Sequence, residues 1–270
     1  MSAAEDLKSF KGIEQWAERK LGLFFEPEQL PALRRRIQGL VDRRSLGSTA
    51  NLLTELQKDP EAWAATIAET FATHHTGFFR EVIVLDRITS ECIPSFGRSL
   101  EKRRIWSAAS STGEEAYSVA MLLAEKYGAG QAAANFSILG TDLVQKVVGV
   151  AERGVYGGGP MKAVSAERRQ KWFERTRDGR FGVNQELRNL TTFRRLNLMK
   201  SPWPFKKQFS IILCRNVLYY FDKPNQERIL NRLYEACEPG GWLLTSVSES
   251  LHESRSNWKT LASGVHHKAK

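Results

Sequence analysis

Two adjacent carboxylates at the start of a helical stretch pose the first chemical question in this sequence. Glu114 and Glu115 follow a loop of small residues, and that loop follows the apolar run RRIWSAAS. A phosphate-binding loop would favour free N–H groups without neighbouring acids. The helix macrodipole also favours acids at a helix start. The pair is therefore compatible with a site for a cationic ligand and with ordinary helix stabilisation.

Polar residues follow the other apolar runs in the same way. In an open α/β sheet, ligands bind outside the carboxyl ends of the strands, near the point where strand order reverses. Residues at these ends are therefore the candidates for a ligand site. They are residues 110–115, Thr141 and Asp142, Asn197 and Leu198, residues 214–216 and residues 246–249.

Asp142 ends the run FSILGTDL, where nucleotide-binding α/β domains place an acid that binds a ribose. It would equally suit the N-cap of the helix that follows. The first loop has a single glycine, Gly113, with neither G-x-G-x-x-G nor the lysine of a P-loop. The acids suit a ligand with a ribose and a positive charge but no phosphate. S-adenosylmethionine is such a ligand.

Residues 1–75 have apolar residues at the spacing that is typical of helices. Segments such as FKGIEQWAERKLGL, LPALRRRIQGLVDRR and EAWAATIAETFA place apolar residues three and four positions apart. The segment STANLLTELQKDP opens with residues that cap helices and closes before a proline. We expect an N-terminal all-α helical domain over residues 1–75.

From residue 76 onward, short apolar runs alternate with helical stretches, which predicts a parallel sheet with helices on both faces. We expect this α/β domain to span residues 76–270. The stretch PNQERILNRLYEACEPGG predicts a helix that ends in a Pro-Gly-Gly turn. Residues 157–192 interrupt the alternation, and RDGRFGVNQEL predicts a hairpin around Asp178 and Gly179. We expect a small β-subdomain inserted there.

Composition bears on location and metal binding. No window approaches 18 uncharged apolar residues, so we expect no membrane-spanning helix. The N-terminus does not have the pattern of a signal peptide. Three widely spaced cysteines, Cys92, Cys214 and Cys237, indicate buried reduced thiols in a cytoplasmic protein. The adjacent histidine pairs lack the spacing of metal ligands, so we predict no metal.

Five segments together carry a family resemblance, and they occur in the order 73–81 (THHTGFFRE), 106–120 (WSAASSTGEEAYSVA), 140–143 (GTDL), 194–199 (RRLNLM) and 214–230 (CRNVLYYFDKPNQERIL). They resemble the chemotaxis receptor methyltransferases, the CheR family, over nearly the whole chain. The resemblance implies a Rossmann-like S-adenosylmethionine-dependent methyltransferase domain with a small β-subdomain insertion, preceded by an N-terminal all-α helical domain.

The resemblance also implies the cofactor site. Asp142 would bind the ribose hydroxyls, and Glu115 would face the charged methionine end. His74 stands where the family usually has asparagine, which changes one cofactor contact because imidazole is bulkier and can titrate. The positions that match cofactor-binding residues of the family are His74, Thr76, Arg80, Glu115, Asp142, Asn197, Leu198, Arg215 and Asn216.

The implied reaction is methylation of glutamate side chains on the cytoplasmic domain of a chemoreceptor. A glutamate with a pKa of about 4.3 is already ionised at neutral pH, so the reaction needs no general base. The resemblance implies that Arg80 and Tyr220 orient this carboxylate. Tyr220 matches a tyrosine near the transferred methyl group, whereas Tyr219 is expected to pack in the core.

The implied partner is acidic, and the chain carries a net charge of +10. A basic N-terminal helix of the family is thought to meet the receptor, and a β-subdomain docks a receptor tail peptide in some relatives. We expect the chain to be a monomer. The basic helix here would contact substrate through Arg34, Arg35, Arg36, Arg43 and Arg44.

Other functions compete with this interpretation. A nucleic-acid methyltransferase would explain the charge, but the segment CRNVLYY lacks the Pro-Pro-aromatic motif of amino-group methylases, and no aromatic-basic platform is evident. We therefore expect no nucleic-acid partner. A non-catalytic protein that binds S-adenosylmethionine or a receptor is the remaining alternative, and His74 is the feature that suggests it.

Overall fold

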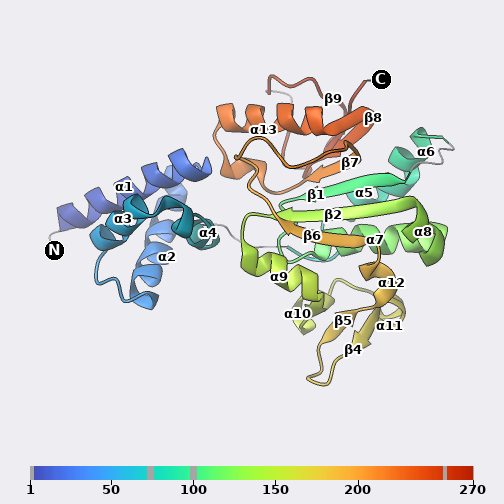
Figure 1. The fold of residues 1–270 in the computed structure, drawn as a ribbon, viewed down its shortest axis with the longest axis horizontal. Coiled ribbons are helices and arrows are strands. Elements are labelled where there is room, and N and C mark those ends of the chain that lie inside the picture. The colour runs from blue at the N-terminus through green and yellow to red at the C-terminus, as the bar shows by residue number, and fades with distance from the viewer. Residues whose placement is uncertain (1–2, 72–75, 98–101, 252–253, 270) are drawn as a thin grey trace. The chain divides into compact units, whose positions relative to one another are not determined.

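A computed structural model describes residues 3–71, 76–97, 102–251 and 254–269 of the chain (Figure 1). It divides into two compact units, one formed by residues 1–74 with 219–225 and the other by residues 75–218 with 226–270. Within the described residues, no helix combines the length and the apolar character needed to cross a membrane.

The helical unit contains helices of the predicted type. Its core is built from fully buried side chains such as Ile13, Ile37 and Leu52, which recur on the inward faces of the helices. The helix that contains Leu52 begins after Ser48, whose side chain accepts a hydrogen bond from the Asn51 N–H. The helices are α1 (Ala3–Leu21), α2 (Leu30–Arg43), α3 (Thr49–Lys58) and α4 (Pro60–Phe71), with a short 3₁₀ turn at Pro27–Gln29.

A short segment from late in the chain joins this unit. Phe221 forms an isolated antiparallel bridge with Leu23, and the Phe24 N–H donates to the Tyr220 carbonyl at 2.7 Å. Nothing in the sequence predicted this pairing, because the two segments are nearly 200 residues apart and neither is a regular strand. Tyr220 therefore belongs with the helices rather than with the sheet.

The other unit is built on a seven-stranded sheet in the order β6-β2-β1-β7-β8-β10-β9. Its first five strands run parallel, β10 pairs antiparallel with β8, and β9 pairs antiparallel with β10. The parallel strands lie in the five predicted runs, and the inner ones are largely buried, whereas β6 at the sheet edge buries only Phe193. They are β1 (Arg103–Ala108), β2 (Phe136–Asp142), β6 (Thr191–Arg195), β7 (Phe209–Cys214) and β8 (Cys237–Leu244). The two added strands, β9 (Lys259–Ala262) and β10 (Val265–His267), were not predicted.

Helices cover both faces of this sheet, as predicted. Alternate strand residues, including Ile105, Ile138 and Ile211, share one hydrophobic core with α5, α7 and α9. Figure 1 shows α13 on the opposite side of the strands from α7 and α9. The bounds are α5 (Val82–Arg87), α6 (Ile93–Ser95), α7 (Glu114–Tyr127), α8 (Ala129–Asn135), α9 (Gln145–Arg153) and α13 (Lys223–Ala236), with a π-helical turn at Ile88–Cys92.

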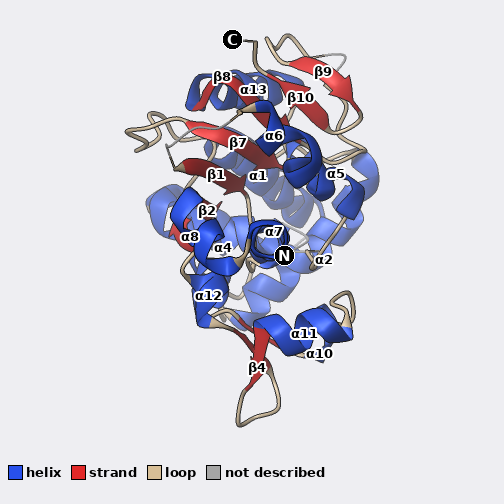
Figure 2. Cartoon of the chain, turned by 90° about the vertical axis from the view of Figure 1, so that its right-hand side faces the viewer, coloured by secondary structure: helices blue, strands red, loops and turns tan. Residues whose placement is uncertain are grey.

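A second, three-stranded sheet in the order β3-β5-β4 lies in the region of the predicted insertion, with β3 just before its expected start at residue 157. The predicted hairpin is present between β4 and β5, and Gly179 in its turn has a φ of +78°. Figure 2 shows β4, α10 and α11 together, apart from the main sheet. This segment contains β3 (Val155–Tyr156), α10 (Gly158–Met161), α11 (Ala166–Trp172), β4 (Phe173–Arg175), β5 (Phe181–Val183) and α12 (Gln185–Arg188).

The predicted Pro-Gly-Gly turn is wrong. Helix α13 ends at Ala236 and β8 begins at once, so that residues 239–241 form an irregular stretch inside the strand, where its register with β7 shifts. Gly241 packs so closely that an added Cβ would lie 2.5 Å from the Cys237 sulfur. The glycines serve a tight β-bulge rather than a surface turn. Cys92, Cys214 and Cys237 are buried free thiols, as predicted.

Candidate active site

The carboxyl ends of β2, β1 and β7 meet where strand order reverses, because the chain passes from β1 to β2 on one side and to β7 on the other. The backbone is strained here. In the described part of the chain, six non-glycine residues have positive φ values, and one of them, Ser45, lies in the helical unit. The other five are at strand ends or in the segment that faces them, which is typical of functional sites. They are Phe79, Glu81, Ala109, Ser111 and Asn216.

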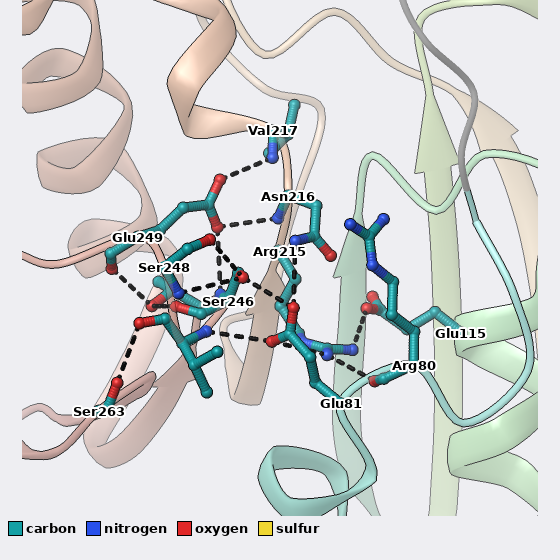
Figure 3. A network of polar contacts seen from close by, with 12 residues as sticks. Arg80, Glu81, Glu115, Arg215, Asn216, Val217, Ser246, Ser248, Glu249 and Ser263 are labelled. Atoms are coloured by element: carbon teal, nitrogen blue, oxygen red, sulfur yellow. Dashed lines mark hydrogen bonds and ion pairs between the residues drawn. The ribbon is translucent and has the colours of Figure 1, made fainter.

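Arg215 is the centre of this edge. Its side chain is 1% exposed, and its Nη1 donates to Glu115 Oε2 at 2.8 Å. Its Nη2 donates to the Arg80 carbonyl at 2.6 Å and lies 3.3 Å from Glu81 Oε2. Figure 3 shows these contacts. A buried guanidinium needs such acids, since an unpaired buried charge is costly.

Glu115 therefore has a partner that the sequence did not reveal. Besides Arg215, it accepts a hydrogen bond from the Ser107 hydroxyl at 2.7 Å. Its carboxylate is held between the end of β1 and the end of β7. Glu115 can contribute negative charge to a ligand site, but only as part of an ion pair.

Glu249 fixes the loop that leaves β7. It is buried, and it accepts the N–H groups of Asn216 and Val217 at 2.8 Å and that of Ser246 at 3.1 Å (Figure 3). It also accepts the Leu218 N–H at 2.9 Å. Burial raises the pKa of Glu249, although these backbone hydrogen bonds oppose the rise. One carboxylate thus holds the loops after β7 and β8 together.

Glu81 connects the segment 76–81 to the same loops. Its Oε1 accepts from the Ser246 hydroxyl at 2.8 Å and the Asn216 amide at 3.3 Å, and its Oε2 accepts from the Val247 N–H at 3.0 Å. Burial alone would raise the pKa of Glu81, but these bonds and the charge of Arg215 lower it below the ordinary value.

The Asp142 carboxylate binds the loop that follows β1. It accepts the Ser111 N–H at 2.9 Å and the Val144 N–H at 3.0 Å, and Asp142 itself is partly exposed. The N-cap of α9 is Val144 rather than Asp142, so the alternative of a helix cap is wrong. Asp142 therefore holds the loops that follow β1 and β2 together.

Glu114 has a different environment from Glu115. It is 3% exposed, and the Thr112 hydroxyl donates to it at 2.6 Å. Burial raises the pKa of the Glu114 carboxyl. The two acids thus separate, with Glu114 packed inside the start of α7 and Glu115 turned to Arg215.

Two buried polar atoms at this edge have no protein partner among the described residues, namely Ser111 Oγ and Arg215 Nε. Buried polar groups are usually hydrogen-bonded, so such atoms are available to a polar ligand. With the carboxylates of Asp142 and Glu115 they form a mixed set of donors and acceptors. The set fits S-adenosylmethionine, which has hydroxyls, an ammonium group and a carboxylate.

The remaining predicted cofactor residues lie near this cluster or outside the described chain. Arg80 is exposed, and its carbonyl binds Arg215 (Figure 3). Thr76 is partly exposed, three residues before the strained Phe79. His74 lies outside the described residues.

Asn197 and Leu198 follow β6, the strand beside β2. The Leu196 N–H donates to the Asp142 carbonyl at 2.8 Å, which keeps the end of β6 beside that of β2. The Asn197 side chain accepts the Met199 N–H at 2.8 Å, and Leu198 is buried. The sequence placed these residues correctly at a strand end.

Tyr220 belongs to the helical unit, whereas Arg80 belongs to the unit built on the sheet. Its ring centroid lies 4.4 Å from that of Tyr219. Tyr219 is 45% exposed, so the expectation that it packs in the core is wrong. Tyr219 lies in the short 3₁₀ turn Leu218–Tyr220 that follows β7, and much of its side chain is open to solvent.

The five arginines predicted to contact substrate differ in their side-chain contacts. Four belong to α2, and Arg44 is its C-cap residue. Arg36 donates to the Phe71 carbonyl at 3.1 Å, Arg34 lies over the ring of Phe10, and Arg44 lies over the ring of Trp63. The two others, Arg35 and Arg43, are exposed, as are Arg36 and Arg44.

Ser246 and Glu249 were among the strand-end candidates but had no predicted role, and Ser107 was not predicted as a site residue. A signal for Glu249 existed, because it is an acid shortly after an apolar run, as Asp142 is. Its four N–H partners could not be read from the sequence. Ser107 lies inside a strand, where nothing separates it from a packed serine.

Comparison with known proteins identifies the family to which the chain belongs. Residues 74–266 match the model described as CheR methyltransferase, SAM binding domain. A chemotaxis protein methyltransferase of Vibrio parahaemolyticus is 31% identical over 248 residues, covering 90% of each chain. One from Pseudomonas aeruginosa is 29% identical over 279 residues, covering 100% of each chain.

A probable chemotaxis protein methyltransferase of Rhizobium etli is 36% identical over 205 residues, covering 73% of this chain and 76% of that one. The family model spans the segments that supply the polar cluster at the sheet edge, from residues 76–81 to residues 246–249. This chain therefore belongs to the CheR methyltransferase family, and the domain that carries the cluster is its S-adenosylmethionine-binding domain.

Proposed function

We propose that this chain is a protein-glutamate O-methyltransferase that uses S-adenosylmethionine to methylate the cytoplasmic domain of a chemoreceptor. The observation that supports this most directly is the convergence of residues 76–81, 110–115, Asp142 and 215–216 of the family domain on one sheet edge. The names of its relatives supply the chemotactic context.

Within this proposal, the Asp142 carboxylate binds the ribose hydroxyls through the lone pairs that the Ser111 and Val144 N–H groups do not occupy. Glu115 and Arg215 act as a pair at the methionine end, where the substrate groups carry both signs of charge. Asn197, Leu198 and Asn216 flank the adenine and the methyl group, and Thr76 and His74 complete the site.

S-adenosylmethionine supplies an electrophilic methyl group on a sulfonium. The incoming glutamate is ionised at neutral pH, so the protein needs to position it rather than deprotonate it. Arg80 and Tyr220 are the residues proposed to orient this carboxylate. Arg80 is exposed, which suits a weak hold, because a tight ion pair would stabilise the ground state more than a transition state with less negative charge.

The receptor contact is proposed to involve the arginines of α2, since methylation regions of receptors are acidic in this family. Exposed arginines steer an acidic partner over a distance of about 10 Å at 0.1 M salt. The small subdomain is the proposed place for a receptor tail peptide. The reaction would take place in the cytoplasm.

The first test is calorimetric titration with S-adenosylhomocysteine of the wild type, Asp142→Ala and Asp142→Asn. The asparagine variant retains one acceptor for the Ser111 and Val144 N–H groups, which separates loss of ribose binding from loss of loop structure. We expect wild-type binding in the micromolar range and a loss of about 10–100-fold in both variants.

The second test is transfer of a radiolabelled methyl group to receptor-rich membranes, with release of the label by mild base as the sign of a glutamate ester. Binding of S-adenosylhomocysteine without any transfer would contradict the enzyme and favour a non-catalytic regulator. Failure of the wild type to bind would contradict the cofactor site itself.

A further inference from the structure

The segment that carries Arg80 and Glu81 rests on the small subdomain as well as on the main sheet. Phe78 is 2% exposed, and its ring packs edge-on against Tyr156 of β3 and Phe173 of β4, with centroids 5.0 and 5.5 Å away. The inserted subdomain thus packs against the segment that supplies Arg80 and Glu81 to the candidate site.

Phe79 is one of the two strained residues of this segment, together with Glu81. The φ of Phe79 is +56°, and its N–H donates to the Ser118 hydroxyl at 2.9 Å. That hydroxyl in turn donates to the Glu114 carbonyl at 2.7 Å, in the first turn of α7. A left-handed phenylalanine is unfavourable on its own, so the surroundings must hold it.

Arg168 of α11 holds the other side of Phe79. Its guanidinium carbon lies 4.1 Å from the centre of the Phe79 ring, which is a close cation–π contact. The contact joins the subdomain to the residue immediately before Arg80. A shift of the Phe79 ring would therefore displace the adjoining backbone of Arg80, whose carbonyl accepts a hydrogen bond from Arg215.

Glu125, near the end of α7, fixes the orientation of Arg168. It accepts two hydrogen bonds from the guanidinium, at 2.9 and 2.8 Å, and one from Trp172 Nε1 at 3.1 Å. The hydrogen bond to Glu125 raises the pKa of Arg168. Burial would raise the pKa of Glu125, but the bonds from Arg168 and Trp172 outweigh it and lower that pKa. A bidentate pair holds a guanidinium plane in one orientation, as stacking on a ring requires.

We propose that Arg168, oriented by Glu125, is a positioning residue of the cofactor site, which holds Phe79 in its left-handed conformation and so fixes Arg80 and Glu81. The proposal rests on the proposed cofactor site for its effect on binding. Its effect on the backbone of residues 79–81 does not depend on any ligand. The subdomain would then influence cofactor binding through one side chain.

The test compares Arg168→Met with Arg175→Met. Arg175 is a matched control, because it also belongs to the subdomain and stacks on a phenylalanine, with its guanidinium carbon 4.0 Å from the centre of the Phe181 ring. It donates to Gly179 in the hairpin turn rather than to α7. Both variants lose one charge and one cation–π contact, and both keep an unbranched apolar side chain.

Hydrogen exchange of the amides of residues 79–81 is measured in the free protein, and S-adenosylhomocysteine binding is measured by calorimetry. We expect Arg168→Met to exchange faster and bind more weakly, each by about fivefold, the factor that one such contact supplies. Arg175→Met should match the wild type in both. Glu125→Gln, which keeps the Arg168 charge but weakens its orientation, should fall between, and it serves if Arg168→Met does not fold.

Unchanged exchange at residues 79–81 in the Arg168 and Glu125 variants would overturn the proposal. So would an equal change in Arg175→Met, because it would indicate general loosening of the subdomain. If the wild type does not bind S-adenosylhomocysteine, the proposed function fails, yet faster exchange in Arg168→Met alone would still support the positioning role. The two failures are therefore distinguishable.

Discussion

Arg215 and Arg35 carry the same guanidinium group, one at the end of β7 and the other on α2. Arg215 is 1% exposed within its side chain and has Glu115 and Glu81 against it, whereas Arg35 is exposed. Burial makes the first charge a local structural element whose loss leaves acids unpaired. Exposure lets the second act at a distance on an incoming partner, with little effect on folding.

The largest effect should come from removing the buried charge. Arg215→Met leaves Glu115 and Glu81 uncompensated, so we expect the free energy of unfolding to fall by about 3–5 kcal/mol. Urea denaturation followed by circular dichroism measures it. Arg43→Met on α2 is the control, with an expected change within about 0.5 kcal/mol. Similar losses in the two variants would show that burial does not separate these regions.

The carboxylate of Glu249 accepts hydrogen bonds from four backbone N–H groups. Glu249→Gln replaces it with a neutral amide, so we expect the free energy of unfolding to fall by about 1–3 kcal/mol. Glu238→Gln is the matched control. Glu238 pairs with Arg103 at a partly exposed position, so its loss should cost about 1 kcal/mol or less. Chemical denaturation of both variants tests whether the hydrogen bonds of Glu249, rather than its charge alone, stabilise the strand ends.

The pH dependence of stability sharpens the contrast, because arginines do not titrate in this range but Glu81 does. Its folded-state pKa lies below the ordinary value of 4.5, so the folded state releases the proton more readily. The stabilisation is complete above the unfolded pKa and is lost as pH falls through the folded one. Glu81→Gln should therefore be less stable than the wild type by about 1–2 kcal/mol at pH 7.

That difference should shrink as pH falls below about 4.5. Thermal unfolding of both proteins at pH 7 and pH 3.5 measures it. A difference that grows on acidification would mean that the pKa of Glu81 is raised by its burial rather than lowered by its partners.

The smallest effect on folding should come from Arg35→Gln combined with Arg43→Gln, within about 0.5 kcal/mol. The pair leaves Arg36 in place, since its bond to the Phe71 carbonyl is structural. We expect slower methyl transfer at low salt, and the difference from the wild type should vanish at about 0.5 M salt, where screening removes steering. A deficit that persists at high salt would indicate direct contact instead.

The inner parallel strands could be predicted because burial on both faces leaves long apolar runs, as in β7, whose residues are all buried. The edge strand β6 buries only Phe193, so its signal is weaker. The antiparallel pair β9 and β10 could not be predicted, since KTLA and VHH are short, and the exposed Leu261 gives no alternation. The Pro-Gly-Gly stretch was predicted as a turn because such residues usually mark turns. Only the close approach of Gly241 to the Cys237 sulfur shows that they lie in a bulge.

Local sequence patterns were enough to predict which residues stand at strand ends, so that Asp142, Arg215 and Asn216 were expected at one edge of the sheet. They were also enough to identify the family, because its motifs are local. The partners of these residues, in contrast, depend on the folded structure. Arg215 pairs with Glu115 from a position 100 residues further along the chain, and Glu249 lies 33 residues beyond the Asn216 N–H that it accepts. Side chains meet across crossovers whose geometry depends on packing, and no spacing in the sequence records that.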